Sequence, residues 1–126
     1  MQISRGTGPR PSSGGFETFS WYYFRVSGVL LIFLIIVHLI IMHVTTDVAA
    51  TTYQFVANRY SNPFWRVFDW LLLTLALTHG MNGLRIVIDD YVRSSRSRMV
   101  MLSLAAVLLA AFFMLGTITL ITFRGN

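Results

Sequence analysis

Residues 69–91 read DWLLLTLALTHGMNGLRIVIDDY, an apolar run with polar side chains in its second half. The run is longer than the roughly 20 residues that an α-helix needs to cross a bilayer. Its first half is hydrocarbon, whereas its second half contains His79, Asn82, Arg85 and an Asp-Asp-Tyr end. Ionisable groups inside a spanning helix are costly unless they line a cavity, bind a cofactor or reach an interface. This stretch therefore predicts a membrane helix that carries the function of the chain.

The composition assigns the rest of the chain to the membrane as well. Of the 126 residues, 55% are hydrophobic and 12% are charged, whereas a soluble domain has about 25% charged residues. The lack of cysteine excludes disulfides, thiolate metal sites and Cys-ligated iron–sulfur clusters within the chain. All ten cationic side chains are Arg and lie mostly at the ends of apolar runs. The net charge of +5 therefore indicates membrane topology, and we expect no nucleic-acid binding.

Three apolar segments predict an all-α membrane protein with transmembrane helices at about residues 21–44, 67–91 and 99–123. Residues 1–20 form a Gly/Ser/Pro-rich tail without the pattern of a signal peptide. Residues 21–126 then form one three-helix domain. Arg residues are most frequent near the N-terminus and in the link between the second and third segments. The positive-inside rule therefore places the N-terminus in the cytoplasm and the C-terminus outside.

His79 lies deep in the second segment, and Gly83 follows one turn later on the same face. An imidazole in an apolar helix, beside a surface without a side chain, suits haem ligation. His79 could instead hydrogen-bond to another helix or relay protons, and the glycines could serve close helix packing. Likewise, Asp90 could only end the helix, and Tyr91 could be an ordinary interfacial aromatic residue. The spacing alone leaves these alternatives open.

His38, in the first segment, is a second candidate ligand. Arg25 is expected at the membrane boundary, and His38 lies about 20 Å from it along the helix axis, which we expect to be level with His79. It could bind the same haem or a second haem, or it could be structural. His43 is expected near the outer surface, where it is solvated. Arg25 itself could be a positive-inside anchor whose side chain extends to the lipid headgroups.

The second segment also carries a longer pattern, His-x-x-x-Gly followed by Asp-Tyr. Here it runs from His79 through Gly83 to Asp90 and Tyr91, with the His and the Tyr 12 positions apart. This pattern resembles the small cytochrome b-type membrane anchor of succinate dehydrogenase (complex II), the D-type subunit. The segment FRVSGVLLIF, residues 24–33, resembles the first helix of both anchor subunits of that enzyme. The three-span layout and the length agree as well.

The resemblance implies a role for individual side chains. It places an axial ligand of haem b on His79, packing of that haem on Gly83, and a contact with a haem propionate on Arg25. The second axial ligand normally comes from a histidine of the sister C-type anchor subunit. The resemblance places a quinone hydrogen bond on Tyr91, with Asp90 beside it as a possible proton relay. His38 has no counterpart in the single-haem members of the family.

The resemblance also implies a function for a larger complex. Succinate would be oxidised on a flavoprotein subunit, and electrons would pass through an iron–sulfur subunit to quinone, either menaquinone or ubiquinone. This chain would be a non-catalytic anchor subunit, within a larger anchor bundle in a bacterial cytoplasmic (inner) membrane. The quinone-site Ser of the C-type subunit would fall on Trp21, and this departure favours the D-type. The alternatives are a fumarate reductase anchor and, in another class, a structural or transport bundle without a redox cofactor.

Overall fold

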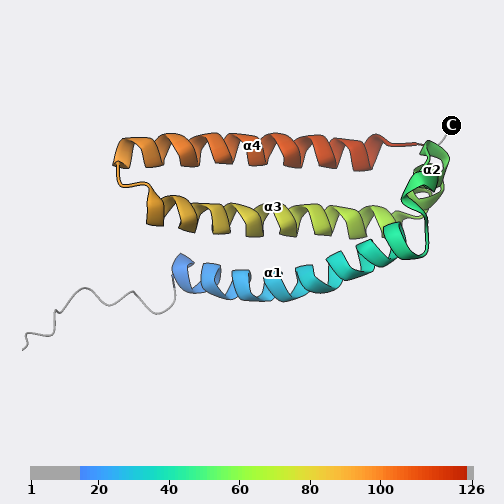
Figure 1. Cartoon of the computed structure of the whole chain (residues 1–126), viewed down its shortest axis with the longest axis horizontal. Coiled ribbons are helices and arrows are strands. Elements are labelled where there is room, and N and C mark those ends of the chain that lie inside the picture. The colour runs from blue at the N-terminus through green and yellow to red at the C-terminus, as the bar shows by residue number, and fades with distance from the viewer. Residues whose placement is uncertain (1–14, 125–126) are drawn as a thin grey trace, which may run out of the picture.

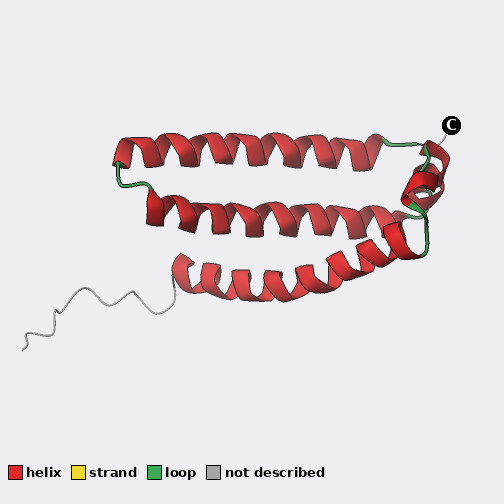
Figure 2. Cartoon of the chain, viewed as in Figure 1, coloured by secondary structure: helices red, strands yellow, loops and turns green. Residues whose placement is uncertain are grey.

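Three long apolar helices make up most of the structure, which is a computed structural model that describes residues 15–124. They are α1 (Phe16–Leu39), α3 (Pro63–Tyr91) and α4 (Ser95–Thr122), and the described chain contains no strand (Figure 2). By length and apolar composition each of them is able to cross a membrane. The expected all-α fold with three membrane helices is therefore confirmed.

The middle position of α3 decides which side chains can meet. α3 lies between α1 and α4, and successive long helices run in opposite directions (Figure 1). The hydroxyl groups of Tyr23 on α1 and Thr78 on α3 are 2.7 Å apart. On the other side of α3, the indole Nε1 of Trp70 donates to the hydroxyl of Thr117 on α4, at 3.2 Å. Functional groups on α3 can therefore be oriented from α1 or from α4.

Local capping sets the helix starts, which differ from the expected ones. Pro63 occupies the first turn of α3, and the side chain of Asn62 accepts a hydrogen bond from the backbone N–H of Phe64 at 2.9 Å. Ser94 caps α4 in the same way. α1 begins at Phe16, before the expected start at residue 21. Of the tail expected over residues 1–20, residues 1–14 lie outside the described residues and residues 16–20 belong to α1. Hydropathy marks the lipid-embedded length, whereas these helices continue into the interface.

The segment between the first two membrane helices contains structure that the sequence analysis did not predict. α1 continues into a π-helical turn η1 (Ile40–Val44), which is followed by a 3₁₀ turn η2 (Val48–Ala50) and the short helix α2 (Tyr53–Tyr60). Thr52 caps α2 by accepting a hydrogen bond from the N–H of Phe55. We call the end of the bundle that carries α2 the α2 end (Figure 1).

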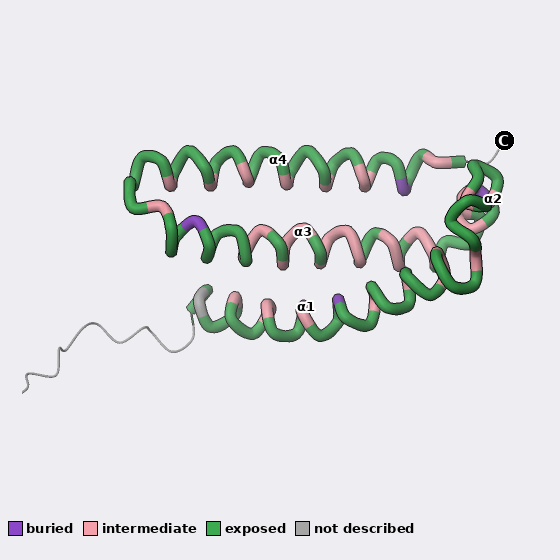
Figure 3. Tube along the Cα trace, in the orientation of Figure 1, coloured by how far each residue is buried: buried purple, intermediate pink, exposed green. Residues whose placement is uncertain are grey.

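Very few side chains are buried by the chain itself, as the predominantly exposed trace in Figure 3 shows. The buried residues of the described chain are four apolar ones and one polar one: Leu31, Ala57, Ile88, Leu120 and Ser27. Large apolar side chains are exposed along all three long helices. Lipid or neighbouring subunits can cover such surfaces in a membrane, where helix association depends on packing and polar contacts.

Candidate functional site

His79 faces α1 and is held there by polar and aromatic contacts. Its Nδ1 lies 3.3 Å from the hydroxyl oxygen of Ser27. The ring of Phe24 meets the imidazole edge-on, with the ring centroids 6.2 Å apart. A Cβ on Gly28 would lie 3.3 Å from Cε1 of His79, so the glycine allows this close approach. The ring is therefore oriented by one polar contact and by the lack of a side chain at position 28.

The second ring nitrogen of His79 is available for another group. Nε2 makes no hydrogen bond to a described residue. It is also absent from the buried polar atoms without a partner, so the chain does not fully enclose it. A Cβ on Gly80 or Gly83 would meet nothing within 4 Å. Within the described chain, the surface of α3 is therefore open at Gly80 and Gly83.

A pocket of about 560 Å³ lies between the start of α1 and the second half of α3. Its lining combines aromatic and polar side chains, namely Phe16, Ser20, Trp21, Phe24, Arg25, Asn82, Arg85 and Ile86. The guanidinium group of Arg25 stacks on the ring of Trp21, 4.4 Å from its centroid. Neither Arg25 nor Arg85 has an ion-pair partner among the side chains that the structure describes. Two unpaired guanidinium groups that share one pocket suit an anionic group.

Tyr91 and Asp90 lie at the end of α3 and face away from the rest of the chain. The side chain of Tyr91 is on the surface, since the residue is 82% exposed. Asp90 has no ion-pair or hydrogen-bond partner within residues 15–124, whereas Asp89 lies 3.5 Å from Arg98 on α4. If Tyr91 and Asp90 bind a ligand, another molecule must form the other walls of its site.

His38 does not lie at the depth of His79, and this expectation was wrong. Its Nδ1 is 3.7 Å from the carboxylate of Asp69. Asp69 precedes His79 by ten residues on α3, which corresponds to about 15 Å along the axis. The expectation failed because it placed Arg25 at the membrane boundary, whereas Arg25 shares a pocket with Asn82, well inside the end of α3.

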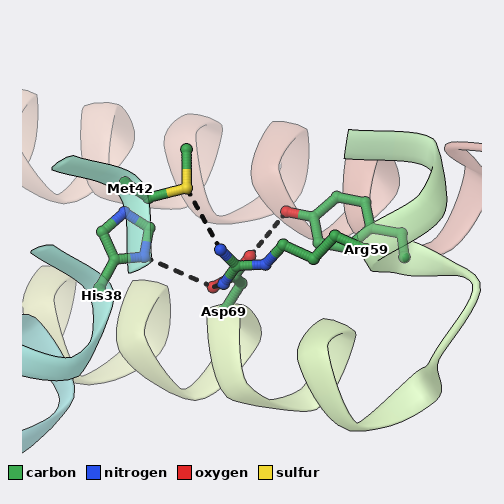
Figure 4. A network of polar contacts seen from close by, with 5 residues as sticks. His38, Met42, Arg59 and Asp69 are labelled. Atoms are coloured by element: carbon green, nitrogen blue, oxygen red, sulfur yellow. Dashed lines mark hydrogen bonds and ion pairs between the residues drawn. The ribbon is translucent and has the colours of Figure 1, made fainter. Parts of the chain in front are cut away.

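His38 instead belongs to a polar cluster at the α2 end (Figure 4). The guanidinium of Arg59, on α2, donates to one carboxylate oxygen of Asp69 at 2.8 Å, and Tyr60 donates to the other at 2.8 Å. Arg59 also contacts the sulfur of Met42 at 3.2 Å. Burial and the hydrogen bond to Asp69 raise the pKa of the Tyr60 phenol above its ordinary value. This cluster joins α1, α2 and α3 at a distance from His79.

Several of these residues were not selected from the sequence. Ser27 is a polar residue inside an apolar run, and that position was the available signal for a contact with another helix. Asn82 and Arg85 were recognised as polar but were not assigned to one pocket with Arg25. The pairing of Arg59 with Asp69 had no signal in the sequence, because ten positions separate them across the break between two helices.

Comparison with known proteins agrees with this architecture. Residues 4–118 match the family described as succinate dehydrogenase/fumarate reductase transmembrane subunit. One relative is the succinate dehydrogenase hydrophobic membrane anchor subunit of Thermoplasma acidophilum, 29% identical over 58% of this chain and 59% of the relative. Another is the succinate dehydrogenase 2 membrane subunit SdhC of Mycobacterium tuberculosis, 29% identical over 71% of this chain and 66% of the relative.

This chain thus spans about three fifths to two thirds of the curated relatives that it matches. Their names do not separate the two anchor types, so the D-type assignment stays a prediction. The family match extends over most of the chain and includes α1, α3 and nearly all of α4. The chain therefore belongs to the family of succinate dehydrogenase/fumarate reductase transmembrane subunits.

Proposed function

We propose that this chain anchors a succinate:quinone oxidoreductase in the membrane and ligates haem b through His79. The observation that carries the proposal is the arrangement of the imidazole. Its Nδ1 contacts Ser27 on α1, while its Nε2 has no partner among the described residues. Histidine ligands commonly engage one ring nitrogen with the protein and offer the other to the metal. A bound haem b would supply one-electron transfer.

The pocket beside His79 supports the proposal, because its charge fits a haem. Arg25 and Arg85 line the pocket from α1 and α3, and Asn82, which also lines it, lies between His79 and Arg85 in the sequence. Haem propionates are anionic, and Arg forms strong hydrogen bonds to carboxylates. We therefore assign the propionates to Arg25, as expected from the sequence, and add Arg85. The open surface at Gly83 leaves room for the edge of the macrocycle.

A second protein ligand to the haem iron would come from another chain in this proposal. His38 contacts Asp69 at the α2 end, far from His79, and His43 is exposed on the π-helical turn at the same end. Neither is placed to share an iron with His79. We propose a histidine of a sister C-type anchor subunit as the partner ligand, with the D-type role for this chain. His38 then has a structural role beside Asp69.

Tyr91 and Asp90 are proposed to form one wall of a quinone site. A phenol can donate a hydrogen bond to a quinone carbonyl without introducing a buried charge. Asp90, which is exposed and has no partner among the described residues, can exchange protons with water. Quinone reduction consumes two protons, so an interfacial position suits the reaction. The exposure of Tyr91 requires that neighbouring subunits complete the site.

The remaining parts of the proposal concern the complex and its setting. We place this end of the bundle at the cytoplasmic face of a bacterial inner membrane, with the C-terminus outside, because Arg residues cluster at this end. An iron–sulfur subunit and a flavoprotein subunit would dock there, since the chain has no cysteine for a thiolate-bound cluster. A fumarate reductase anchor is the alternative, and the family description covers both enzymes.

The haem spectrum of the purified complex tests the proposed ligand. His79→Ala should abolish or strongly shift the b-type absorption bands, because it removes an axial ligand. His43→Ala is the matched control, since it removes an exposed histidine from α1's extension. We also expect His38→Ala to retain the haem. An unaltered spectrum in an assembled His79→Ala complex would refute the assignment.

The quinone proposal is tested by Tyr91→Phe, which keeps the ring and removes the hydroxyl. Quinone-linked turnover should fall, while succinate oxidation with an artificial acceptor that takes electrons upstream should persist. Tyr22→Phe is a control, because Tyr22 is a tyrosine that is also exposed on the surface, on α1. Unchanged quinone turnover in Tyr91→Phe would place the quinone elsewhere.

A further inference from the structure

Ser27 is the most deeply buried polar side chain of the described protein. It is 1% exposed, whereas Val26 and Val29 nearby on α1 are exposed. A buried hydroxyl is unfavourable in an apolar environment unless it is hydrogen-bonded. The partners of Ser27 therefore decide what this residue can do.

The hydroxyl of Ser27 can donate one hydrogen bond, and a backbone carbonyl already accepts that bond. Its Oγ donates to the carbonyl of Phe24, one turn earlier on α1, at 3.1 Å. The same Oγ lies 3.3 Å from Nδ1 of His79. Because a hydroxyl has a single donor, Ser27 can engage His79 only by accepting a hydrogen bond from an Nδ1–H group.

This arrangement selects one of the two neutral tautomers of the imidazole. A proton on Nδ1 leaves the lone pair on Nε2, which is the nitrogen without a partner in the described chain. The alternative tautomer would bring two lone pairs, of Nδ1 and Oγ, toward each other unless Ser27 gave up its bond to Phe24. Gly28 supports the same ring position, because a side chain there would press against Cε1 of His79.

We propose that Ser27 is a positioning residue that holds His79 in the Nδ1–H tautomer and thereby presents the Nε2 lone pair to iron. The effect on iron rests on the proposed haem ligation. The hydrogen bond between Ser27 and His79 lies within this chain and does not require haem. Donation from Nδ1–H also makes an imidazole ligand more basic. With haem b bound, Ser27 would therefore stabilise the ferric state relative to the ferrous state and lower the midpoint potential.

The first test measures the tautomer without any haem. The full chain is labelled with ¹⁵N-histidine, placed in lipid nanodiscs without haem, and examined by nitrogen NMR. The His79 signals are assigned by comparison with His38→Gln and His43→Gln. The wild-type protein should show His79 protonated at Nδ1. In Ser27→Ala the ratio of the tautomers should move toward Nε2–H by roughly two- to tenfold, the effect of one hydrogen bond of ordinary strength.

Tyr23→Phe is the matched control for Ser27→Ala. The Tyr23 hydroxyl contacts Thr78 at 2.7 Å, so it also links α1 to α3 and lies beside His79, but it does not contact the imidazole. We expect Tyr23→Phe to leave the tautomer ratio unchanged. Equal shifts in the two variants, or Nε2–H as the main wild-type tautomer, would overturn the proposal. The wild-type tautomer can be determined whether or not Ser27→Ala and Tyr23→Phe fold.

The second test measures the haem in the assembled complex. Redox titration of the b-type absorption should show a more positive midpoint potential in Ser27→Ala than in the wild type, and Ser27→Thr should restore the wild-type value. An unchanged potential in a Ser27→Ala complex that retains its haem would overturn the proposed effect on iron. If the wild-type complex contains no haem, the proposed function fails, and the nitrogen spectrum still decides the hydrogen bond between Ser27 and His79.

Discussion

The ion pair between Arg59 and Asp69 should be a main stabilising contact of the α2 end. Both groups are largely buried, with side-chain exposures of 8% for Arg59 and 14% for Asp69, and their atoms are 2.8 Å apart. The pair connects the short helix α2 to the membrane helix α3 (Figure 4). Tyr60 adds a second hydrogen bond to the same carboxylate. We therefore choose Asp69→Asn and Arg59→Gln as the perturbations.

The expected loss follows from the burial of the charge that remains. Removing one partner of a buried ion pair typically costs about 3–5 kcal/mol, because the other charge stays desolvated. Here the loss should be smaller, since Arg59 retains contacts with the sulfur of Met42 and with the ring of Trp65. An Asn at position 69 can also still accept hydrogen bonds. We estimate that each single substitution destabilises the fold by about 2 kcal/mol.

A double-mutant cycle separates this pair from other effects. Wild type, both single variants and the double variant are unfolded reversibly by adding sodium dodecyl sulfate to mixed micelles, and helix content is followed by circular dichroism. The double variant should be little less stable than either single variant, so the coupling energy should approach 2 kcal/mol. Single losses below about 0.5 kcal/mol that add independently would refute the reasoning. The content of the proposed haem should be the same in the double variant as in the wild type, because Asp69 lies about 15 Å from His79.

Three further substitutions test the packing and the charges of the same helices. Gly28→Ala should displace the His79 ring by a few tenths of an ångström and broaden the EPR signal of the proposed haem, whereas an EPR signal identical to wild type would contradict the close contact. Gly116→Val should separate α3 from α4 and lower the melting temperature, because even a Cβ at this position overlaps the side chain of Leu73. Since burial raises the pKa of Tyr60, its neutral phenol contributes stability below pH ~10 that is lost as the pH rises above the unfolded-state pKa. Tyr60→Phe should weaken this dependence in melts across pH 8–11, and an unchanged pH profile would count against the buried phenol.

The sequence predicts the membrane class and the three spans because each depends on the apolar composition of a long continuous segment. A helix that crosses a bilayer needs roughly 20 apolar residues, and this requirement leaves few alternatives. α2 was missed because a helix of 8 residues that carries charge has no such signature. Its position depends on the contact of Arg59 with Asp69, which is tertiary.

The relative depth of residues on different helices was the least predictable feature. Counting along one helix gives distances accurately, so the spacing from His79 to Tyr91 needed no structure. Comparing α1 with α3 requires their register, which the sequence analysis fixed from the charge of Arg25 alone. The contacts of Ser27 with His79 and of His38 with Asp69 give a different register. The side chain of an Arg can extend several ångströms along the helix axis, so the position of a single Arg is a poor reference for depth in the membrane.

Two groups of polar side chains lie between α1 and α3, one at the α2 end and one around His79. They differ in which of their charged and hydrogen-bonding groups have partners within the chain. At the α2 end, the carboxylate of Asp69 is paired with Arg59 and accepts a hydrogen bond from Tyr60. In the other group, His79 uses only Nδ1, and Arg25 and Arg85 face one pocket without an acidic partner among the described side chains.

Polar groups at membrane depth are costly, and evolution retains them where they serve a site. The carboxylate at the α2 end has its partners within this chain, although Nδ1 of His38 and Nε of Arg59 make no hydrogen bond to a described residue. Around His79, Nε2 and the two guanidinium groups have no hydrogen-bond or ion-pair partner among the described side chains. In the proposed function, Nε2 of His79 binds a metal ion, and the guanidinium groups of Arg25 and Arg85 bind an anion. One ligand that offers both a metal ion and carboxylates would satisfy all three groups together. The arrangement of these side chains thus supports the haem b of the proposed function.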